Sequence, residues 1–286
     1  MPIETQTGAP WGLARISQRP QLTSSTVDKY KFDGRAGEGV DIYVLDTGID
    51  TANTQFQGRA RWGTNVTGDG SDRDTVGQGT HLAGTAASLK YGVAKKASLI
   101  AVKVVAGNAL ADPKHIVAGL AWTVEQAESS GRPSVALIGS CLARNLELDE
   151  QVNDAVRQGL FVVAPAGDDN KDASDYSPSG ASGAFTVGAS SLRDERAFFS
   201  NHGPSVDVFA PGHSILSTLI GGINTRSGTA HAAAHIAGLA AYLLSLTNDV
   251  TTTNVRDAIT AAATPDLLTG IPPQTSNLLA FNNATS

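Results

Sequence analysis

Short apolar runs and amphipathic segments alternate along most of this chain. The apolar runs cover residues 40–48, 98–105, 134–140 and 159–167, and the amphipathic segments cover residues 79–89, 113–129 and 148–159. Buried strands that alternate with amphipathic helices are typical of βαβ units. The pattern therefore predicts an α/β fold in three layers, with a central, mostly parallel sheet flanked by helices.

Two further helices are expected in the C-terminal third. The segment from Thr229 to Leu246 is apolar nearly all round and contains no charged residue, so it should lie buried at the centre of the fold. Residues 249–264 predict a capped helix near the C-terminus. The composition of the 286 residues shows no break and no internal repeat, which favours a single domain over residues 1–286.

Charge and composition argue against nucleic acid and membranes as binding partners and bear on the location of the protein. The net charge is −6 without any cluster of Lys and Arg, which argues against a nucleic-acid partner. No apolar run approaches the roughly 20 residues needed to cross a bilayer, so no membrane partner is expected. The first residues lack the basic-then-apolar plan of a secretory signal, and the one cysteine, Cys141, cannot form an internal disulfide. We expect a cytoplasmic location; the sequence leaves the oligomeric state open.

Polar and small residues follow three of the predicted strands. Asp46 ends the first, Gly139 and Cys141 follow a later one, and Gly167 with Asp168 follows the next. Ligands of parallel sheets bind outside the carboxyl ends of the strands. The sequence therefore predicts a binding site on this rim.

Several segments, taken in order, resemble the signature segments of the subtilisin-like serine proteases (peptidase S8). They are "VLDTGID", "GQGTHLAGT", "GVAKKASLIAVKV", "APAGDDN" and "SGTAHAAAHIAGLAAYL". The segments "APWGLARIS", "DYSP" and "FAPGHSILST" resemble the proteinase K branch. The resemblance covers nearly the whole chain. It implies a subtilisin-like fold and a catalytic Asp, His and Ser assisted by an asparagine that stabilises the oxyanion.

The catalytic positions implied by the resemblance have changed in this chain. Asp46 matches the aspartate, but Gln78 stands at the position of the histidine and cannot exchange a proton near neutral pH. Ala230 replaces the serine and has no nucleophilic atom. Asp168 replaces the asparagine, and its carboxylate would repel an oxyanion. We interpret the chain as a natural pseudoprotease and not as a functional serine protease.

The resemblance also bears on metal binding. Where the proteinase K branch carries an aspartate that binds calcium, this chain has Ser191. Calcium sites need carboxylate oxygens, so the predicted site is weak or absent, and no other metal or cofactor is expected.

The changed residues predict a new polar site, formed by Asp46, Gln78, Asp168 and His231 around one cleft. In this hypothesis His231 donates or accepts a proton with Asp168 as its partner, and Asp46 accepts a hydrogen bond from the Gln78 amide. Such a site could isomerise, cyclise or dehydrate a small substrate rich in carbonyl groups. The prediction is an intracellular non-hydrolytic enzyme of the cyclase, isomerase or lyase type, with a small, biosynthetic substrate.

Other residues are expected to line the cleft. The bulk of Leu110, together with Pro113 and its missing amide hydrogen, favours a small molecule over a peptide. The predicted substrate-binding residues are Leu110, Gly139, Ser140, Cys141, Ala166, Gly167 and Ala230. The alternatives are a noncatalytic module that binds a peptide or protein and, more remotely, a residual hydrolase. His231 could also point to solvent, and Asp168 could cap a turn.

Overall fold

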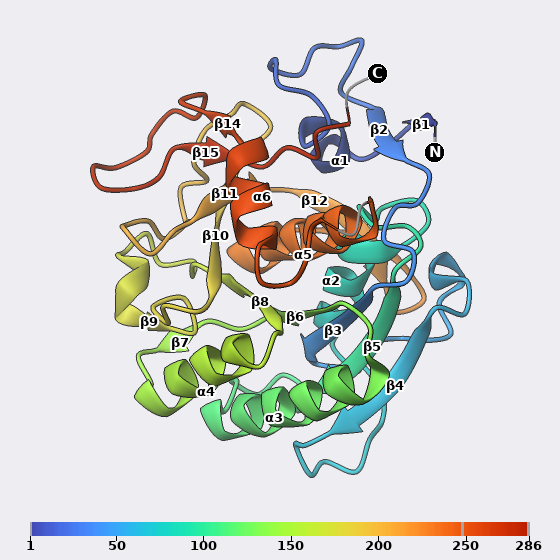
Figure 1. Cartoon of the computed structure of the whole chain (residues 1–286), viewed down its shortest axis with the longest axis vertical. Helices are drawn as coiled ribbons and strands as arrows, with labels where there is room; N and C mark the ends of the chain where they lie inside the picture. The colour runs from blue at the N-terminus through green and yellow to red at the C-terminus, as the bar shows by residue number, and fades with distance from the viewer. Residues whose placement is uncertain (1, 247–248, 285–286) are drawn as a thin grey trace.

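A nine-stranded sheet forms the centre of the computed structural model, which describes residues 2–246 and 249–284 (Figure 1). Its strand order is β14, β15, β11, β10, β8, β6, β3, β5, β4. All neighbours pair in parallel except β14 and β15. The strands are β3 (Asp41–Asp46), β4 (Ala60–Asn65), β5 (Ser98–Lys103), β6 (Ser134–Ile138), β8 (Phe161–Pro165), β10 (Phe185–Ser190), β11 (Val208–Pro211), β14 (Thr264–Pro265) and β15 (Leu278–Leu279).

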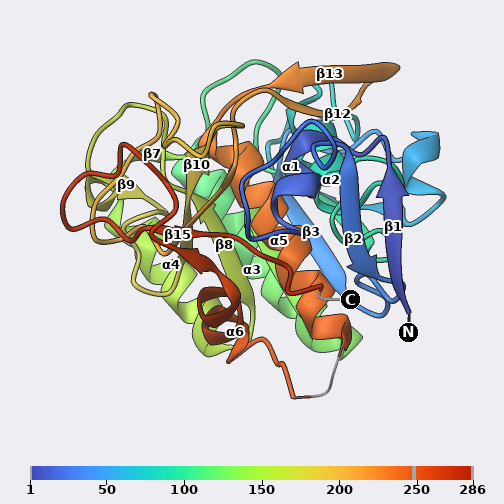
Figure 2. The same ribbon diagram turned by 90° about the horizontal axis from the view of Figure 1, so that it is seen from above.

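Helices cover both faces of this sheet, as Figure 2 shows. On one face lie α2 (Gln78–Ala87) and α5 (Thr229–Leu246), and on the other lie α3 (Pro113–Ser130) and α4 (Leu146–Arg157). The side chains of β3 alternate between the two layers, so that Ile42 packs with the α2 and α5 residues while Tyr43 packs with those of α3 and α4. Because both faces are buried, every residue of β3 is buried.

Smaller elements surround the three layers. Both described ends of the chain lie on the same side, beside the β1–β2 pair (Figure 1). These elements are β1 (Ile3–Thr7), α1 (Trp11–Arg15), β2 (Lys29–Asp33), η1 (Thr54–Phe56), β7 (Leu142–Ala143), η2 (Ala173–Asp175), β9 (Tyr176–Ser177), β12 (Ile215–Leu219), β13 (Gly222–Arg226) and α6 (Val255–Ala262).

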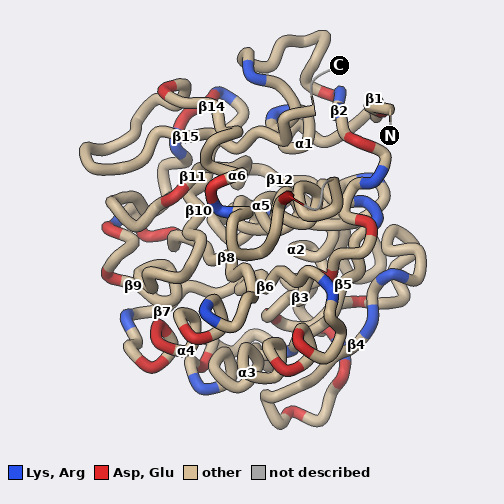
Figure 3. The backbone as a smooth tube through the Cα atoms, in the orientation of Figure 1, with Lys and Arg blue, Asp and Glu red and all other residues tan. Residues whose placement is uncertain are grey.

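Helix α5 is the central helix of the fold. It carries no Lys, Arg, Asp or Glu (Figure 3), and its length and mean hydropathy of 1.3 would allow it to cross a bilayer. However, 89% of it is buried inside the fold, which is typical of a core helix. It packs closely on α2, because Gly238 has no side chain to collide with the carbonyl oxygen of Ala86.

The predicted architecture of a mostly parallel sheet flanked by helices is confirmed. The strands and helices expected from the apolar pattern are present within a few residues of their predicted bounds. The predicted helix over 249–264 is shorter and covers Val255–Ala262, because residues 251–254 form a turn. Strands β4 and β10 were missed because Gly63 and Gly188 interrupt their apolar pattern, and β11 was missed because it has only four residues.

Replacing Gly238 by alanine should destabilise the fold. A Cβ atom there would lie 2.6 Å from the Ala86 carbonyl oxygen, and α2 and α5 would have to move apart. We expect a net loss of about 1–2 kcal/mol in the free energy of unfolding, measured with denaturant, despite the better helix propensity of alanine. Gly222→Ala is the control, since a Cβ there meets nothing within 4 Å. Equal stability of the two variants would contradict this packing.

Candidate functional site

The strand ends that were predicted to converge do so and form one cleft. Asp46 ends β3, Gly139 follows β6 and Gly167 lies just beyond β8. The cleft consists of two adjoining hollows that share Gly139 and Cys141. The larger, of about 420 Å³, is lined by Asp46, Thr47, Val76, Gln78, Val105, Gly107, Asn108, Ala109, Leu110, Ala111, Gly139, Ser140 and Cys141. The smaller, of about 180 Å³, is lined by Gly139, Cys141, Pro165, Gly167, Asp168, Asp169, Thr229 and Ala230.

Asp46 is a buried carboxyl group, 2% exposed, at the wall of the larger hollow. Its Oδ2 atom occupies space that a side chain at position 139 would need, since a Cβ on Gly139 would lie 2.2 Å away. Its Oδ1 atom is buried without a hydrogen-bond partner among the described residues. Burial raises the pKa of Asp46 to about 7, although hydrogen bonds from Thr47 oppose this rise. The group is therefore close to half protonated at neutral pH.

A buried network next to Asp46 fixes the start of α2. The hydroxyl of Thr47 donates to Asp74 at 2.8 Å and accepts the amide hydrogen of Gly79 at 3.0 Å. Asp74 also accepts from the amides of Val76, Gly77 and Thr80 and from the Thr80 hydroxyl. This network places Gln78 at the mouth of the cleft.

Gln78 is held by an arginine that the sequence analysis did not identify. Nη1 of Arg226 donates to the Gln78 side-chain oxygen at 2.7 Å, and Nη2 donates to the Val76 carbonyl oxygen at 3.1 Å. The predicted hydrogen bond from Gln78 to Asp46 is not present in the described part of the chain. Arg226 comes from the far strand of the β12–β13 pair, 148 residues away in sequence, and no sequence motif marks this contact.

Ala230 and Asp168 lie together in the smaller hollow, as predicted. The Asp168 Oδ1 atom accepts the amide hydrogen of Thr229 at 2.8 Å, at the N-terminus of α5. The Thr229 hydroxyl accepts in turn from the amide of Gly167 at 3.0 Å. Asp168 is exposed in the hollow, but neighbouring atoms remove enough water to raise its pKa, against the opposing effect of the Thr229 hydrogen bond. The methyl group of Ala230 offers no nucleophile.

The predicted role of His231 in the cleft is wrong. The residue is 2% exposed, and its ring packs edge-on against the ring of His81, with 4.5 Å between the centroids. It lines neither hollow of the cleft. One residue further along a helix than Ala230, its side chain is turned by about 100° and points toward α2 instead of the cleft. His231 is therefore not placed to contact a ligand in either hollow.

Three buried histidines form a neutral cluster behind the cleft. The His81 Nε2 atom lies 3.1 Å from the carbonyl oxygens of Ile215 and Asn224, and His235 Nδ1 lies 2.9 Å from the His231 carbonyl oxygen. The Nδ1 atoms of His81 and His231 have no hydrogen-bond partner among the described residues. Burial lowers the pKa of His81 and of His235 to about 4, and that of His231 well below its ordinary value.

The remaining predicted binding residues divide into two groups. Leu110, Ser140 and Cys141 line the larger hollow, whereas Ala166 is fully buried and lines neither hollow. The Cys141 sulfur lies 3.7 Å from the Ser179 hydroxyl, and burial raises the pKa of the thiol to about 12, so it is not a nucleophile at neutral pH. Pro113 is the first residue of α3, where its missing amide hydrogen removes nothing from the wall of the cleft.

Ser191 lies in a turn away from the cleft, where its hydroxyl accepts the amide hydrogen of Arg193 at 3.3 Å. The weak or absent calcium site stays a prediction.

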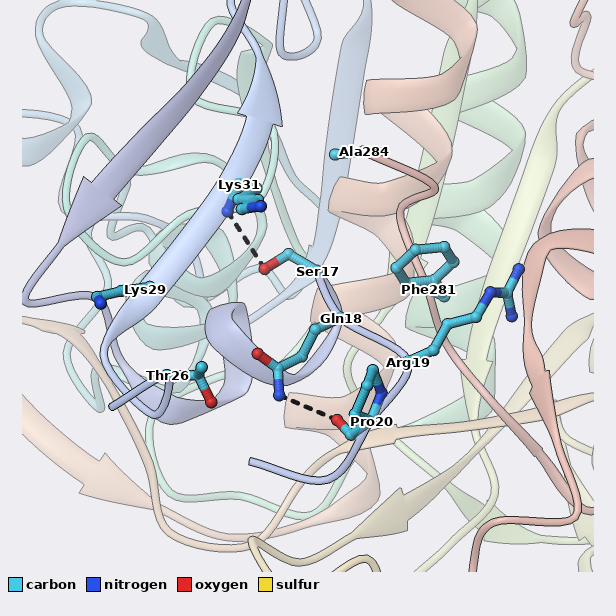
Figure 4. Close-up of a pocket in the computed structure, with 9 residues that line it drawn as sticks. All are labelled: Ser17, Gln18, Arg19, Pro20, Thr26, Lys29, Lys31, Phe281 and Ala284. Atoms are coloured by element: carbon cyan, nitrogen blue, oxygen red, sulfur yellow. Dashed lines mark hydrogen bonds between the residues drawn. The ribbon is translucent and has the colours of Figure 1, made fainter. Parts of the chain in front are cut away.

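A separate hollow of about 390 Å³ lies between the N-terminal elements and the C-terminal segment (Figure 4). Arg19 stacks over the Phe281 ring in it at 4.4 Å, and Lys29 and Lys31 lie at its edge. None of the predicted site residues lines it.

Known proteins resemble this chain over nearly its whole length. The family described as the subtilase family matches residues 37–283. Alkaline protease 2 of Aspergillus fumigatus is 44% identical over 97% of this chain, and the subtilisin-like serine protease Pen c 2 of Penicillium citrinum is 45% identical over 97% of it. The chain spans 61% and 66% of the length of these two proteins.

A solved structure agrees with this similarity. A cold adapted subtilisin-like serine proteinase superposes with a TM-score of 0.90 and 34% sequence identity, covering 96% of this chain and 99% of that one. The resemblance to the proteinase K-type subtilases and their fold is thereby confirmed.

The prediction that this chain is a non-hydrolytic enzyme is wrong. The relatives are named as proteases, and none of these names points to a cyclase, isomerase or lyase. The geometry agrees, since Gln78 is bound to Arg226 and His231 is buried and lines neither hollow of the cleft.

The histidine cluster should make the fold sensitive to acid. In the unfolded chain a histidine has a pKa of about 6.5, so below that pH the unfolded state binds more protons and the fold loses stability as the pH falls. We expect His231→Met to reduce the pH dependence of the free energy of unfolding below about pH 6, because burial holds the pKa of His231 well below its ordinary value in the folded state. Denaturant unfolding at several pH values measures this dependence. Equal slopes in both proteins would contradict a buried neutral His231.

Asp46 should make the stability of the fold depend on pH in the opposite direction, so that stability falls as the pH rises. Its pKa of about 7 lies above the ordinary value of about 4, so its contribution to stability is fully present below pH 4 and is lost as the pH rises through 7. We expect Asp46→Asn to gain roughly 2–4 kcal/mol of stability relative to the native chain between pH 4 and 8. The difference in unfolding free energy between the two proteins, followed across this range, tests it; a constant difference would show that Asp46 is not neutralised by burial.

Proposed function

Because this chain belongs to the subtilase family, we propose that it is a noncatalytic member, a pseudoprotease that binds extended peptides in the cleft and leaves them intact. Its relatives are named as proteases, and the family cleaves peptide bonds through a serine, a histidine and an oxyanion site. The cleft of the fold is kept in this chain, while the groups that would react are absent from it.

The chemistry of the cleft supports the absence of peptide cleavage. Ala230 offers no atom that could attack a carbonyl carbon, and Gln78 cannot take a proton from a hydroxyl group. Loss of the nucleophile alone lowers turnover by about a millionfold in subtilisin. Asp168 would add a repulsion of the oxyanion to this loss. The Thr229 hydroxyl accepts from the Gly167 amide and hydrogen-bonds to the Asp168 carboxylate, so it is held within the turn at the start of α5.

The observation that carries the proposal is a set of four unpaired backbone amides on two segments of the cleft. Residues 109–111 and 139–141 line the larger hollow together. The amides of Leu110, Ala111, Ser140 and Cys141 make no hydrogen bond within the described part of the chain. Free amides of two such segments are what an extended peptide needs in order to pair as an added strand.

A small molecule, which the sequence favoured, fits the cleft less well. Sites for small molecules bury most of the ligand surface. Here Leu110 is 96% exposed at the rim, where it could cover an extended chain but could not enclose a compact ligand.

The proposal predicts binding without cleavage. We expect alanine-based peptides to bind with measurable heat in calorimetry and to remain intact by mass spectrometry after prolonged incubation. The same peptides with N-methylated backbone amides should bind at least about tenfold more weakly, because strand pairing loses its hydrogen bonds.

Two outcomes would contradict this function. Cleavage fragments that appear faster than in buffer would show that the chain is a protease. Flat titrations with all peptides, or equal binding of the methylated ones, would show that the cleft does not pair with a peptide backbone.

A further inference from the structure

The hollow between the N-terminal elements and the C-terminal segment, the N-terminal hollow, has a positively charged lining (Figure 4). Arg19, Lys29 and Lys31 line it, and no Asp or Glu of the described residues does. Its volume of about 390 Å³ lies in the range of small-molecule sites. The whole chain carries a net charge of −6, so this positive charge is a local feature, which an anionic ligand would balance.

Hydrogen bonds hold the walls of the N-terminal hollow together. The Asn282 side-chain amide donates to the Lys31 carbonyl oxygen at 2.7 Å, and its backbone amide donates to the Ile16 carbonyl oxygen at 2.7 Å. The Ser17 hydroxyl accepts the Lys31 amide hydrogen at 3.2 Å and donates to the Ala14 carbonyl oxygen at 3.1 Å. The C-terminal segment, the segment after α1 and strand β2 are thereby fixed to one another. The hollow therefore exists before any ligand binds.

Lys29 and Lys31 lie on one face of β2 and line the N-terminal hollow together. Tyr30, the residue between them, points the other way and packs in the core. The residues opposite the two lysines on β1 are Thr7 and Thr5, which carry no charge. Both lysines are exposed, and neither forms an ion pair within the described part of the chain. Their charges are therefore available to a ligand.

The segment after α1 adds backbone donors. Gln18 and Arg19 are consecutive residues that line the N-terminal hollow, and their amides make no hydrogen bond among the described residues. Successive free amides are a common element of anion-binding sites. The Arg19 guanidinium is held by hydrogen bonds to the Ala263 carbonyl oxygen and the Thr264 hydroxyl, both at 3.3 Å, so a carboxylate does not neutralise it.

The N-terminal hollow also has an apolar part. Pro20, Phe281 and Ala284 line it, and the Arg19 guanidinium stacks over the Phe281 ring at 4.4 Å. The aliphatic stems of the lysines add to this surface. A bare inorganic ion would leave the apolar surface in contact with water, whereas an anion attached to an apolar body would cover it.

We infer that the N-terminal hollow binds a small organic anion, whose phosphate or carboxylate group contacts Lys29, Lys31 and the free amides, and whose apolar body contacts Phe281. Ammonium groups and backbone amides donate hydrogen bonds to both kinds of oxygen. None of the residues that line this hollow lines the cleft, so the inference is independent of the proposed function.

The test compares three probes in titrations of the full chain, followed by the chemical shifts of its backbone amides. Phenyl phosphate carries both the charge and the ring, inorganic phosphate carries only the charge, and phenol carries only the ring. We expect phenyl phosphate to bind with a Kd on the order of 1 mM and each of the others at least about tenfold more weakly. The amides of Gln18 and Arg19 should shift most. Added salt should weaken phenyl phosphate but not phenol, because the two lysines are exposed.

Variants assign the binding to the N-terminal hollow. Lys29→Gln combined with Lys31→Gln should weaken phenyl phosphate at least about tenfold and change the affinity for phenol by less than about twofold. Lys114→Gln combined with Lys171→Gln removes two exposed positive charges that do not line this hollow, and should keep the affinity for phenyl phosphate within about twofold. Should the first double variant fail to fold, Lys31→Gln alone serves and should weaken phenyl phosphate severalfold.

Four outcomes would overturn the inference. Equal affinity for inorganic and phenyl phosphate would show that the apolar part is not recognised. Unchanged binding in the variant of Lys29 and Lys31, or shifts confined to the cleft, would place the anion elsewhere. No shifts at concentrations about tenfold above the expected Kd would show that the hollow is no anion site. Tighter binding of an aspartate-rich peptide than of phenyl phosphate would identify a protein partner in place of a small molecule.

Discussion

The close packing of α5 against α2 and the sheet determines where every group of the cleft lies. This helix is uncharged and buried along its length, so its position is fixed by contacts that leave no room to adjust, such as Gly238 on the Ala86 carbonyl oxygen. Its N-terminus then reaches the rim of the sheet, where Thr229 meets Asp168 and Ala230 lines the hollow. The cleft is thus a consequence of the core, and it persists without the reactive groups of the family.

Sequence periodicity identified the architecture and the rim of the sheet, because both follow from local patterns. Asp46, Gly139 and Gly167 meet since parallel strands end at one edge. The hydrogen-bond partner of Gln78 could not be read in this way, because Arg226 arrives from a distant pair of strands. The direction of the His231 side chain was missed for a different reason. Adjacent residues of a helix point in different directions, and the position of α2 decides which residue of α5 faces the cleft.

Different residues determine the fold and the site of this chain. Similarity to named proteases extends over nearly the whole chain, whereas the Asp168 carboxylate fits its local backbone by accepting an amide hydrogen from α5. The carboxylate at that point is accommodated by the N-terminus of α5 without any change to the core. The similarity to these relatives therefore shows the architecture of this chain, while its site depends on a few residues such as Gln78, Asp168 and Ala230.

The placement of Asp46 beside Gly139 has an evolutionary consequence. A serine regained at position 230 would find no base, and a histidine regained at position 78 would have to displace the bond to Arg226. Asp46, whose Oδ2 atom occupies the space that Gly139 leaves empty, would then be the one acidic neighbour already in place among the family's catalytic groups. No single step of this path restores function by itself, so selection has nothing to favour on the way back. In the proposed pseudoprotease, therefore, no one substitution would restore the catalytic groups of the family.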